Sequence, residues 1–123
     1  MSRHLRPLST VDDIERVVTE SWTRSALIFK HSPTCGISAE AHEEVSEWLS
    51  GDDLAADAYL VDVHADRAIS NALAARFALR HESPQVLLIA RGELLWSASH
   101  YHVTARDIAA ALRQLAPAVS GAA

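Results

Sequence analysis

The chain has 123 residues, 49% of them hydrophobic, with a formal net charge of −5, and this length suits one domain over residues 1–123. A lone lysine, Lys30, and ten scattered arginines form no basic block, and no apolar run approaches the roughly 18 residues of a membrane helix, so neither nucleic acid nor a membrane is an expected partner. The single cysteine, Cys35, cannot close an internal disulfide, and we expect a reduced protein of the cytoplasm.

The first predicted elements are a helix and a buried strand. Apolar residues recur at helical spacing after Ser9 or Thr10, either of which can cap the helix, and acidic residues favour its first turn. This helix is expected to end near Ser21, with Trp22 as a further candidate for its buried face. The continuous apolar run 26–29 then predicts a strand that is buried on both faces.

A second helix and a second strand are expected after the cysteine. Apolar spacing predicts a helix that begins at Gly36 or Ile37, reaches about residue 49 and is stopped by Gly51. Its opposite face carries glutamates, which suits a solvated surface. Another apolar run over 59–63 predicts the next strand.

The last part of the chain predicts a helix, a hairpin and a final helix. Apolar spacing of four residues indicates the first of these helices, glycine in a two-residue turn indicates the hairpin, and a threonine cap opens the last helix. The expected bounds are a helix from near Asp66 to before the breaker at 82–84, strands at 86–90 and 94–97 around Arg91-Gly92, and a helix from Thr104 to Pro117, with a disordered tail over about 117–123.

This order of elements predicts an α/β fold of one domain. Two strands joined through a helix are expected to pair in parallel, and the later hairpin to add antiparallel strands. The result is a central mixed β-sheet flanked by helices on both faces, which is the thioredoxin-like plan.

Cys35 directly follows a predicted strand and directly precedes a predicted helix. A free cysteine most often packs as a small hydrophobe, and this is the plain alternative. At a helix start, however, the N–H groups of Ile37 and Ser38 can face the sulfur and stabilise the nucleophilic thiolate. Lys30 and His31 are expected either to add positive charge near the thiol or to be solvated at the strand end.

Ser38 stands three residues after Cys35, where a dithiol oxidoreductase carries its second cysteine. Its hydroxyl can donate to the sulfur, or it can bond to backbone in the first helical turn, but it cannot resolve a mixed disulfide. Any disulfide that Cys35 makes must therefore involve another molecule.

Ser83-Pro84 comes immediately before a predicted strand. Most bonds before proline are trans, and only about 5–6% are cis. In a thioredoxin-like fold, a cis-proline at this position faces the active cysteine, and the backbone of the residue before it pairs with an extended substrate. We therefore expect Ser83-Pro84 to be cis.

Three stretches, FKHSPTCGIS, DRAISNALAARFALRHESPQVLLI and GELLWSASHYHVT, resemble the monothiol bacilliredoxin family of thioredoxin-like proteins. The resemblance covers roughly 26–108. Its strongest parts are Lys30-His31-Ser32, the Thr-Cys-x-Ile-Ser pattern of 34–38, and the run 81–85. Gly36 departs from the family, which usually has proline there, and makes the motif similar to the Cys-Gly-Phe-Ser of monothiol glutaredoxins.

The resemblance implies that the protein removes bacillithiol from S-bacillithiolated proteins in a redox stress response. Cys35 would take over the bacillithiol as a mixed disulfide and a second low-molecular-weight thiol would regenerate it, so bacillithiol is a co-substrate and no cofactor is implied. Ser83 and Pro84 would align the substrate, and Lys30 would neutralise a carboxylate on the malate part of bacillithiol. The candidate site residues are catalytic Cys35, supporting Lys30, His31, Thr34, Ile37 and Ser38, and substrate-binding Ser83 and Pro84.

Two other hypotheses stay open. Gly36 suits a dimeric carrier that holds a [2Fe–2S] cluster by Cys35 of each subunit together with a small thiol. A thioredoxin-fold adaptor with an idle cysteine is the other. No other residue is assigned to a metal, because His100 and His102 have ligand spacing without two further identified ligands.

Overall fold

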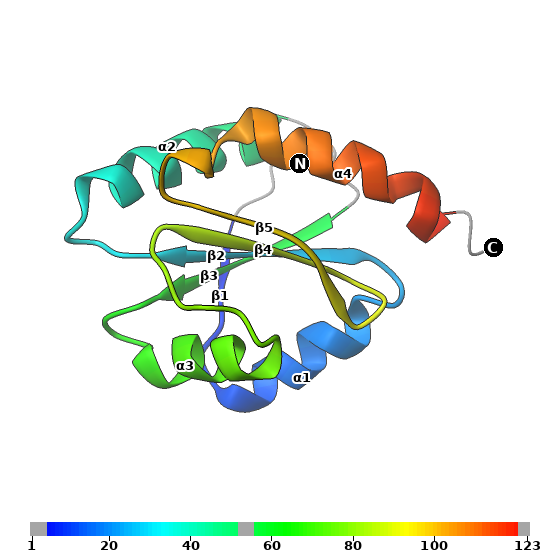
Figure 1. Cartoon of the computed structure of the whole chain (residues 1–123), viewed down its shortest axis with the longest axis horizontal. Coiled ribbons are helices and arrows are strands. Elements are labelled where there is room, and N and C mark those ends of the chain that lie inside the picture. Colours follow the sequence, from blue (N-terminus) through cyan, green and yellow to red (C-terminus); the bar gives the residue numbers. More distant parts are fainter. Residues whose placement is uncertain (1–4, 52–55, 121–123) are drawn as a thin grey trace.

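The computed structural model describes residues 5–51 and 56–120, with side chains described over 5–49 and 56–114. Figure 1 shows a central sheet with helices on both faces. The elements in chain order are β1 (Arg6–Pro7), α1 (Val11–Glu20), β2 (Ser25–His31), α2 (Gly36–Gly51), β3 (Ala56–Asp62), α3 (Arg67–Arg76), β4 (Gln85–Ala90), β5 (Glu93–Ser99), the 3₁₀ helix η1 (His100–His102) and α4 (Ala105–Ser120).

The sheet has the mixed arrangement that the sequence predicts. Its strand order is β1-β3-β2-β4-β5, with β2 parallel to β3 and antiparallel to β4, and with β4 antiparallel to β5. Because β2 and β4 lie in the middle, both faces of each are covered, and this explains why they read as continuous apolar runs. The α/β prediction is confirmed.

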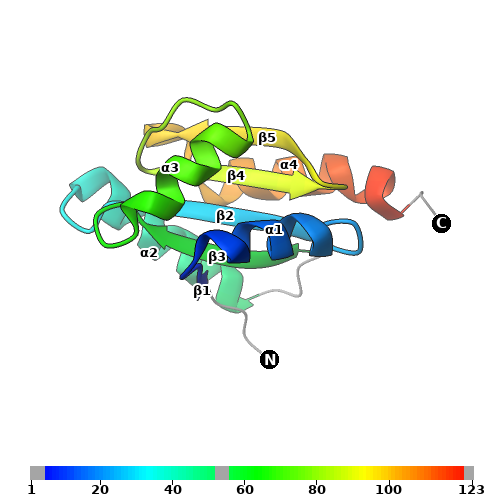
Figure 2. The same cartoon turned by 90° about the horizontal axis from the view of Figure 1, so that it is seen from below.

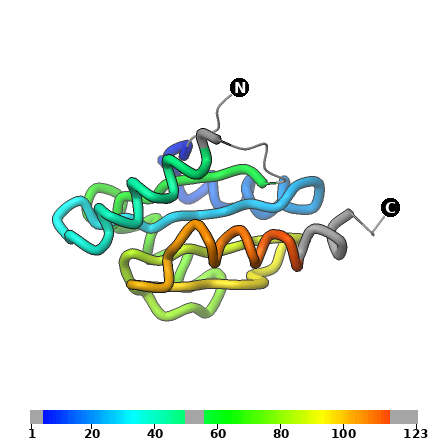
Figure 3. Tube along the Cα trace, turned by 90° about the horizontal axis from the view of Figure 1, so that it is seen from above, coloured from blue at the N-terminus to red at the C-terminus, as the bar shows by residue number. Residues whose placement is uncertain are grey.

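Two hydrophobic clusters join the helices to the sheet. On one face, Ile14 of α1 and Leu73 of α3 are buried against the sheet. On the other face, Val45 of α2 and Ile108 of α4 are fully buried. Figure 2 shows the α1 and α3 face, and Figure 3, seen from the opposite side, shows α2 and α4 in front of the sheet. The sheet therefore separates the two halves of the core.

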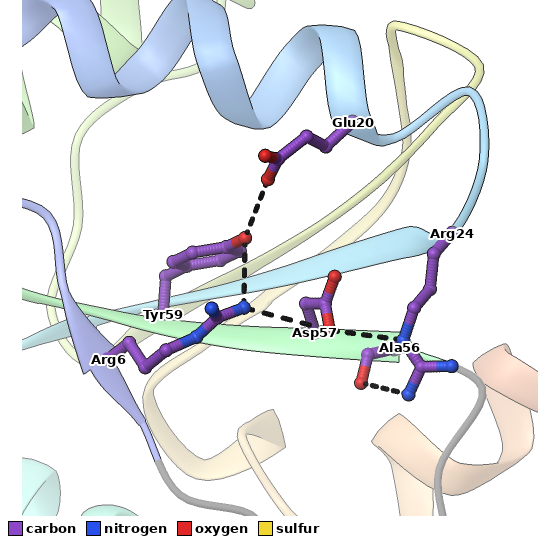
Figure 4. A network of polar contacts seen from close by, with 6 residues as sticks. All are labelled: Arg6, Glu20, Arg24, Ala56, Asp57 and Tyr59. Carbon is purple, nitrogen blue, oxygen red and sulfur yellow. Dashed lines mark hydrogen bonds and ion pairs between the residues drawn. The ribbon is translucent and has the colours of Figure 1, made fainter.

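Strand β1 was not predicted from the sequence because it is two residues long and contains a proline. It pairs in parallel with β3, and a polar network holds it there (Figure 4). Arg6 donates to the hydroxyl of Tyr59 at 3.2 Å and lies 3.6 Å from Asp57, which also pairs with Arg24 at 3.0 Å. The hydroxyl of Tyr59 in turn donates to Glu20 at 3.4 Å. The network links β1, α1, β3 and the turn that leads into β2.

Helix α1 begins as expected, but one residue that was a candidate for its buried face is exposed. Thr10 is its N-cap, with a complete capping box to Asp13. Trp22, a candidate for its buried face, is 65% exposed, which corrects that prediction. The helix ends at Glu20, so Trp22 lies in the turn and no longer follows the helical face. Its indole lies over Gly92 of the β4–β5 hairpin.

The hairpin between β4 and β5 is a two-residue turn, as predicted. Arg91 and Gly92 both have positive φ, 55° and 77°, which is the combination a type I′ turn requires. A Cβ at Gly92 would stand 3.0 Å from Nε1 of Trp22, so this position requires glycine for its conformation and for its space.

Helix α4 opens at the predicted threonine and continues beyond the predicted end. Thr104 Oγ1 accepts the N–H of Asp107 at 3.1 Å, and the helix runs past Pro117 to Ser120. A proline lacks one N–H donor, and here the helix continues beyond it, which corrects the predicted stop. Residues 121–123 of the predicted tail lie outside the described residues. None of the described helices is long and apolar enough to cross a membrane.

Candidate functional site

Cys35 occupies the turn between β2 and α2, as the sequence predicts. Its N–H donates to the carbonyl of Ser32 at 3.1 Å, and its own carbonyl accepts the N–H of Ala39 at 2.9 Å, which is the first hydrogen bond of α2. The cysteine is half-buried. It therefore stands at the N-cap of a long helix, where first-turn N–H groups lack intrahelical partners and negative charge is stabilised.

The cis-proline loop lies at the same end of the sheet. Ser83-Pro84 is cis, as expected, and Pro84 is buried. The next residue, Gln85, pairs with Lys30 across β4 and β2, so the proline stands near the point where β2 leads into the cysteine turn. Figure 1 shows both loops at the left end of the sheet. The N–H of His100 donates to the carbonyl of Pro84 at 2.9 Å, which joins η1 to this loop.

Ser38 is fully buried beneath the cysteine turn. Its hydroxyl accepts the N–H of Ser32 at 2.9 Å and lies 2.8 Å from Nδ1 of His31. Of the two alternatives for this hydroxyl, these contacts favour the bond to backbone over a hydrogen bond to the sulfur of Cys35. Ser38 instead joins the first turn of α2 to the end of β2, and so holds the turn from the inside.

His31 is half-buried and faces α2. Its ring stacks on His42 with 4.6 Å between centroids and meets Phe29 edge-on at 6.0 Å. Burial lowers the pKa of His31, and the neighbouring His42 lowers it further, against an opposing effect of Asp62. The lowered pKa favours the neutral form of His31, so this residue is a poor source of positive charge for the thiol.

Lys30 points to the opposite face of β2 and is fully buried. Its ammonium donates to the carbonyl of Ser70 in α3 at 3.1 Å and lies 3.4 Å from Nδ1 of His81. Burial lowers the pKa of Lys30 to about 8. Because neighbouring residues of a strand face opposite sides, a lysine next to His31 is directed away from α2. This placement corrects the expectation of a surface cation that meets the thiol or a ligand carboxylate.

The two remaining motif residues flank the thiol. Thr34 is exposed and Ile37 is half-buried. Thr34 Oγ1 lies 3.1 Å from Nε2 of His64, a residue that the sequence reasoning did not select. His64 follows β3, and its Nε2 also lies 3.0 Å from Ser32 Oγ. The sequence signal that could have selected His64 was the predicted parallel pairing of the strands now seen as β2 and β3, because this pairing brings their carboxyl ends together.

Beyond the cis-proline loop, η1 presents exposed polar and aromatic groups. His100 Nδ1 lies 3.9 Å from a carboxylate oxygen of Glu82, and Tyr101 is 76% exposed. A groove of about 520 Å³ runs between β5 and α4, with Trp96 and Gln114 among its lining residues. Among the described residues, no group of three or more His, Cys, Asp or Glu side chains is placed to hold a metal ion.

The arrangement offers one nucleophile and no internal partner for it. A half-buried thiol stands at a helix start, a buried serine occupies the position of a second cysteine, and a cis-proline loop lies beside the turn. Such a thiol can exchange only with a sulfur that another molecule brings.

Comparisons with known proteins bear on the family and on the fold. The sequence profile of a family described as monothiol bacilliredoxin BrxC matches residues 6–108. A solved structure described as a candidate oxidoreductase with a thioredoxin fold is 32% identical, with a TM-score of 0.78, and the match covers 87% of this chain and 92% of that protein.

Two thioredoxins share the fold at lower identity. That of Fasciola hepatica is 19% identical, with a TM-score of 0.71, and the match covers 89% of this chain and 98% of the thioredoxin. That of Malassezia sympodialis is 17% identical, with a TM-score of 0.70 and coverage of 93% of each chain. The thioredoxin-like prediction is confirmed.

Proposed function

Because this chain belongs to the monothiol bacilliredoxin family, we propose that it removes bacillithiol from S-bacillithiolated proteins through a mixed disulfide at Cys35. The observation that carries the proposal is the pairing of a half-buried Cys35 at the start of α2 with a fully buried serine three residues later. A mixed disulfide at Cys35 then has no thiol of the same chain to resolve it, since Cys35 is the only cysteine.

The proposed exchange has two balanced steps. The Cys35 thiolate attacks the bacillithiol sulfur of the mixed disulfide, so a new S–S bond forms while the bond to the target protein breaks. The target leaves as a thiolate and takes a proton from water. A second small thiolate then attacks the bacillithiol sulfur, forms a disulfide with it and releases the Cys35 thiolate. No cofactor takes part, and bacillithiol is the co-substrate.

The cis-proline loop is proposed to align the protein substrate. Ser83 is half-buried and precedes the buried Pro84, at the end of the sheet that carries Cys35. A segment laid beside this loop would present its disulfide to the thiol, and orientation of reacting groups is a large part of the acceleration that an exchange enzyme provides. Lys30 is omitted from the proposed ligand contacts because it is fully buried.

Mass spectrometry tests the central step. Incubation with bacillithiol disulfide is expected to add one bacillithiol to the wild-type protein and none to Cys35→Ser, which keeps the size of the side chain and removes the thiol. A second incubation with a small thiol is expected to return the wild-type mass. A wild-type protein that gains no bacillithiol contradicts the proposal.

The cluster-carrier alternative rests on Gly36, and the structure gives glycine no special role there. A Cβ at this position meets no atom within 4 Å, and no positive φ requires glycine. We therefore put the exchange reaction first. Protein purified without oxygen is expected to be colourless, whereas a brown protein with visible absorbance would support the cluster.

A further inference from the structure

The imidazole of His64 contacts both hydroxyl groups that flank Pro33. Its Nε2 lies 3.0 Å from Ser32 Oγ and 3.1 Å from Thr34 Oγ1, and the two hydroxyl oxygens are 3.4 Å apart. Thr34 is the residue directly before Cys35. One ring nitrogen therefore spans the turn that ends at the thiol.

His64 is exposed, and its backbone is held by a hydrogen bond to Asp62. A carboxylate oxygen of Asp62 accepts the N–H groups of His64 at 2.9 Å and of Ala65 at 3.0 Å. Asp62 pairs with His31 in the parallel register of β2 and β3, and the N–H of Val63 donates to the carbonyl of His31 at 3.0 Å. The backbone that carries the imidazole is thus anchored to the end of β3, outside the turn that the ring contacts.

Two residues hold the cysteine turn from different sides. Ser38 accepts the backbone N–H of Ser32 from beneath the turn. His64 meets the side-chain hydroxyls of Ser32 and Thr34 from the side of β3. Without the imidazole, these hydroxyls would bond to water, and the residue before Cys35 would lose its contact with β3.

We propose that His64 is a positioning residue for Cys35, because its imidazole clamps Ser32 and Thr34 and so fixes the turn that presents the thiol to an incoming disulfide. Either tautomer serves, since an imidazole nitrogen either donates to a hydroxyl oxygen or accepts from a hydroxyl group. The proposal assigns a residue to the exchange reaction and in that respect rests on the proposed function.

Two assays of His64 variants test the clamp. The first is alkylation of Cys35 by iodoacetamide, and the second is the exchange rate with bacillithiol disulfide. His64→Ala is expected to slow both by about tenfold, the effect of losing one well-placed hydrogen bond. His64→Gln is expected to recover most of the rate, because its amide can bond to the same hydroxyls. His102→Ala, which removes an exposed imidazole of η1, is the control.

A double-mutant cycle with Thr34→Val separates a clamp from general weakening of the fold. The double variant His64→Ala with Thr34→Val is expected to be no slower than the slower single variant, because both changes remove the same contact. Thermal unfolding of each variant shows that it is folded. Additive effects, or a His64→Ala rate within twofold of wild type, would overturn the proposal. If His64→Ala does not fold, Thr34→Val and His64→Gln still decide it.

Failure of this proposal can be told from failure of the proposed function. Alkylation reports on the thiol whatever its natural partner is. A protein that forms no bacillithiol adduct, yet whose alkylation depends on His64, would lose the proposed function and keep the clamp. If the protein forms the adduct but its alkylation rate does not depend on His64, the proposed function stands and the clamp is excluded.

Discussion

The hydroxyl of Ser38 lies 2.8 Å from Nδ1 of His31, so the residue in the place of a second cysteine joins α2 to the end of β2. The same hydroxyl accepts the N–H of Ser32. Ser38→Ala removes this partner from the buried Ser32 and the half-buried His31 and is expected to lower the free energy of unfolding by about 1–3 kcal/mol. Urea unfolding measures it, with Ser46→Ala, a half-buried serine of the same helix, expected to change it by less than about 0.5 kcal/mol.

Substitution by alanine is expected to change the stability of the protein in opposite directions at Gly92 and at Gly36. Gly92 has a φ of 77° and lies under Trp22, so Gly92→Ala is expected to destabilise the protein by about 1–2 kcal/mol. Gly36 begins α2 with open space around it, so Gly36→Ala is expected to stabilise by about 0.5–1 kcal/mol. Thermal and urea unfolding measure the stability change of each variant. Two changes of the same sign would contradict the placement of one of the glycines.

Gly36→Pro tests the one departure from the family pattern. Proline suits the first position of a helix, because its missing N–H is unpaired there and its φ is already helical. The variant is expected to fold with unchanged or slightly raised stability and to form the bacillithiol adduct at a rate within about threefold of wild type. A variant that loses adduct formation while remaining folded would show that Gly36 takes part in the chemistry.

Lys30 makes stability depend on pH above neutrality. Burial holds its pKa at about 8 in the folded protein, below the 10.5 of an exposed lysine. Between these values, the unfolded chain holds a proton that the folded protein has lost, so stability rises as pH increases from about 8 to 10.5. Urea unfolding at pH 7, 8.5 and 10 should show this rise in wild type, and Lys30→Met should flatten it. A similar rise in the variant would contradict the assignment.

Two histidines make stability depend on pH on the acid side of neutrality, with the same sign as Lys30. Burial is the largest cause that lowers the pKa of His31 and of His81 below 6.5, followed by His42 for the first and Lys30 for the second. The unfolded chain takes up protons near 6.5 while the folded protein does not, so stability is fully present above 6.5 and falls as pH decreases below it. Unfolding at pH 7, 6 and 5 should show a smaller loss for His81→Asn, and an unchanged loss would exclude His81.

Local patterns predicted most of the fold and the position of the thiol. Apolar spacing and caps depend on near neighbours in the chain, and they placed α1, α2, α3, the hairpin and the start of α4. Strand β1 escaped prediction because its pairing with β3 depends on residues far away in the chain. The end of α4 beyond Pro117 and the exposure of Trp22 were also wrong in the prediction.

The surroundings of the thiol were less accessible to sequence reasoning. Lys30 and His31 are adjacent in the chain and were expected either near the same sulfur or solvated at the strand end, but a strand directs them to opposite faces of the sheet. For Ser38 the sequence left two partners open, the sulfur or backbone, and the structure shows its hydroxyl bonded to backbone at the end of β2. His64 carried no motif, and only the pairing of β3 with β2 brings it to Ser32 and Thr34.

By itself, the sequence determined that this protein has one cysteine, that a helix begins directly after it, and that no second thiol stands three residues later. These are properties of composition and of short-range spacing. The tertiary structure decided which groups surround the thiol: a buried Ser38 beneath the turn, His64 beside it and Lys30 on the far face of β2. The reason is physical, since strand pairing and burial set the direction and charge of a side chain, and both depend on contacts between distant parts of the chain.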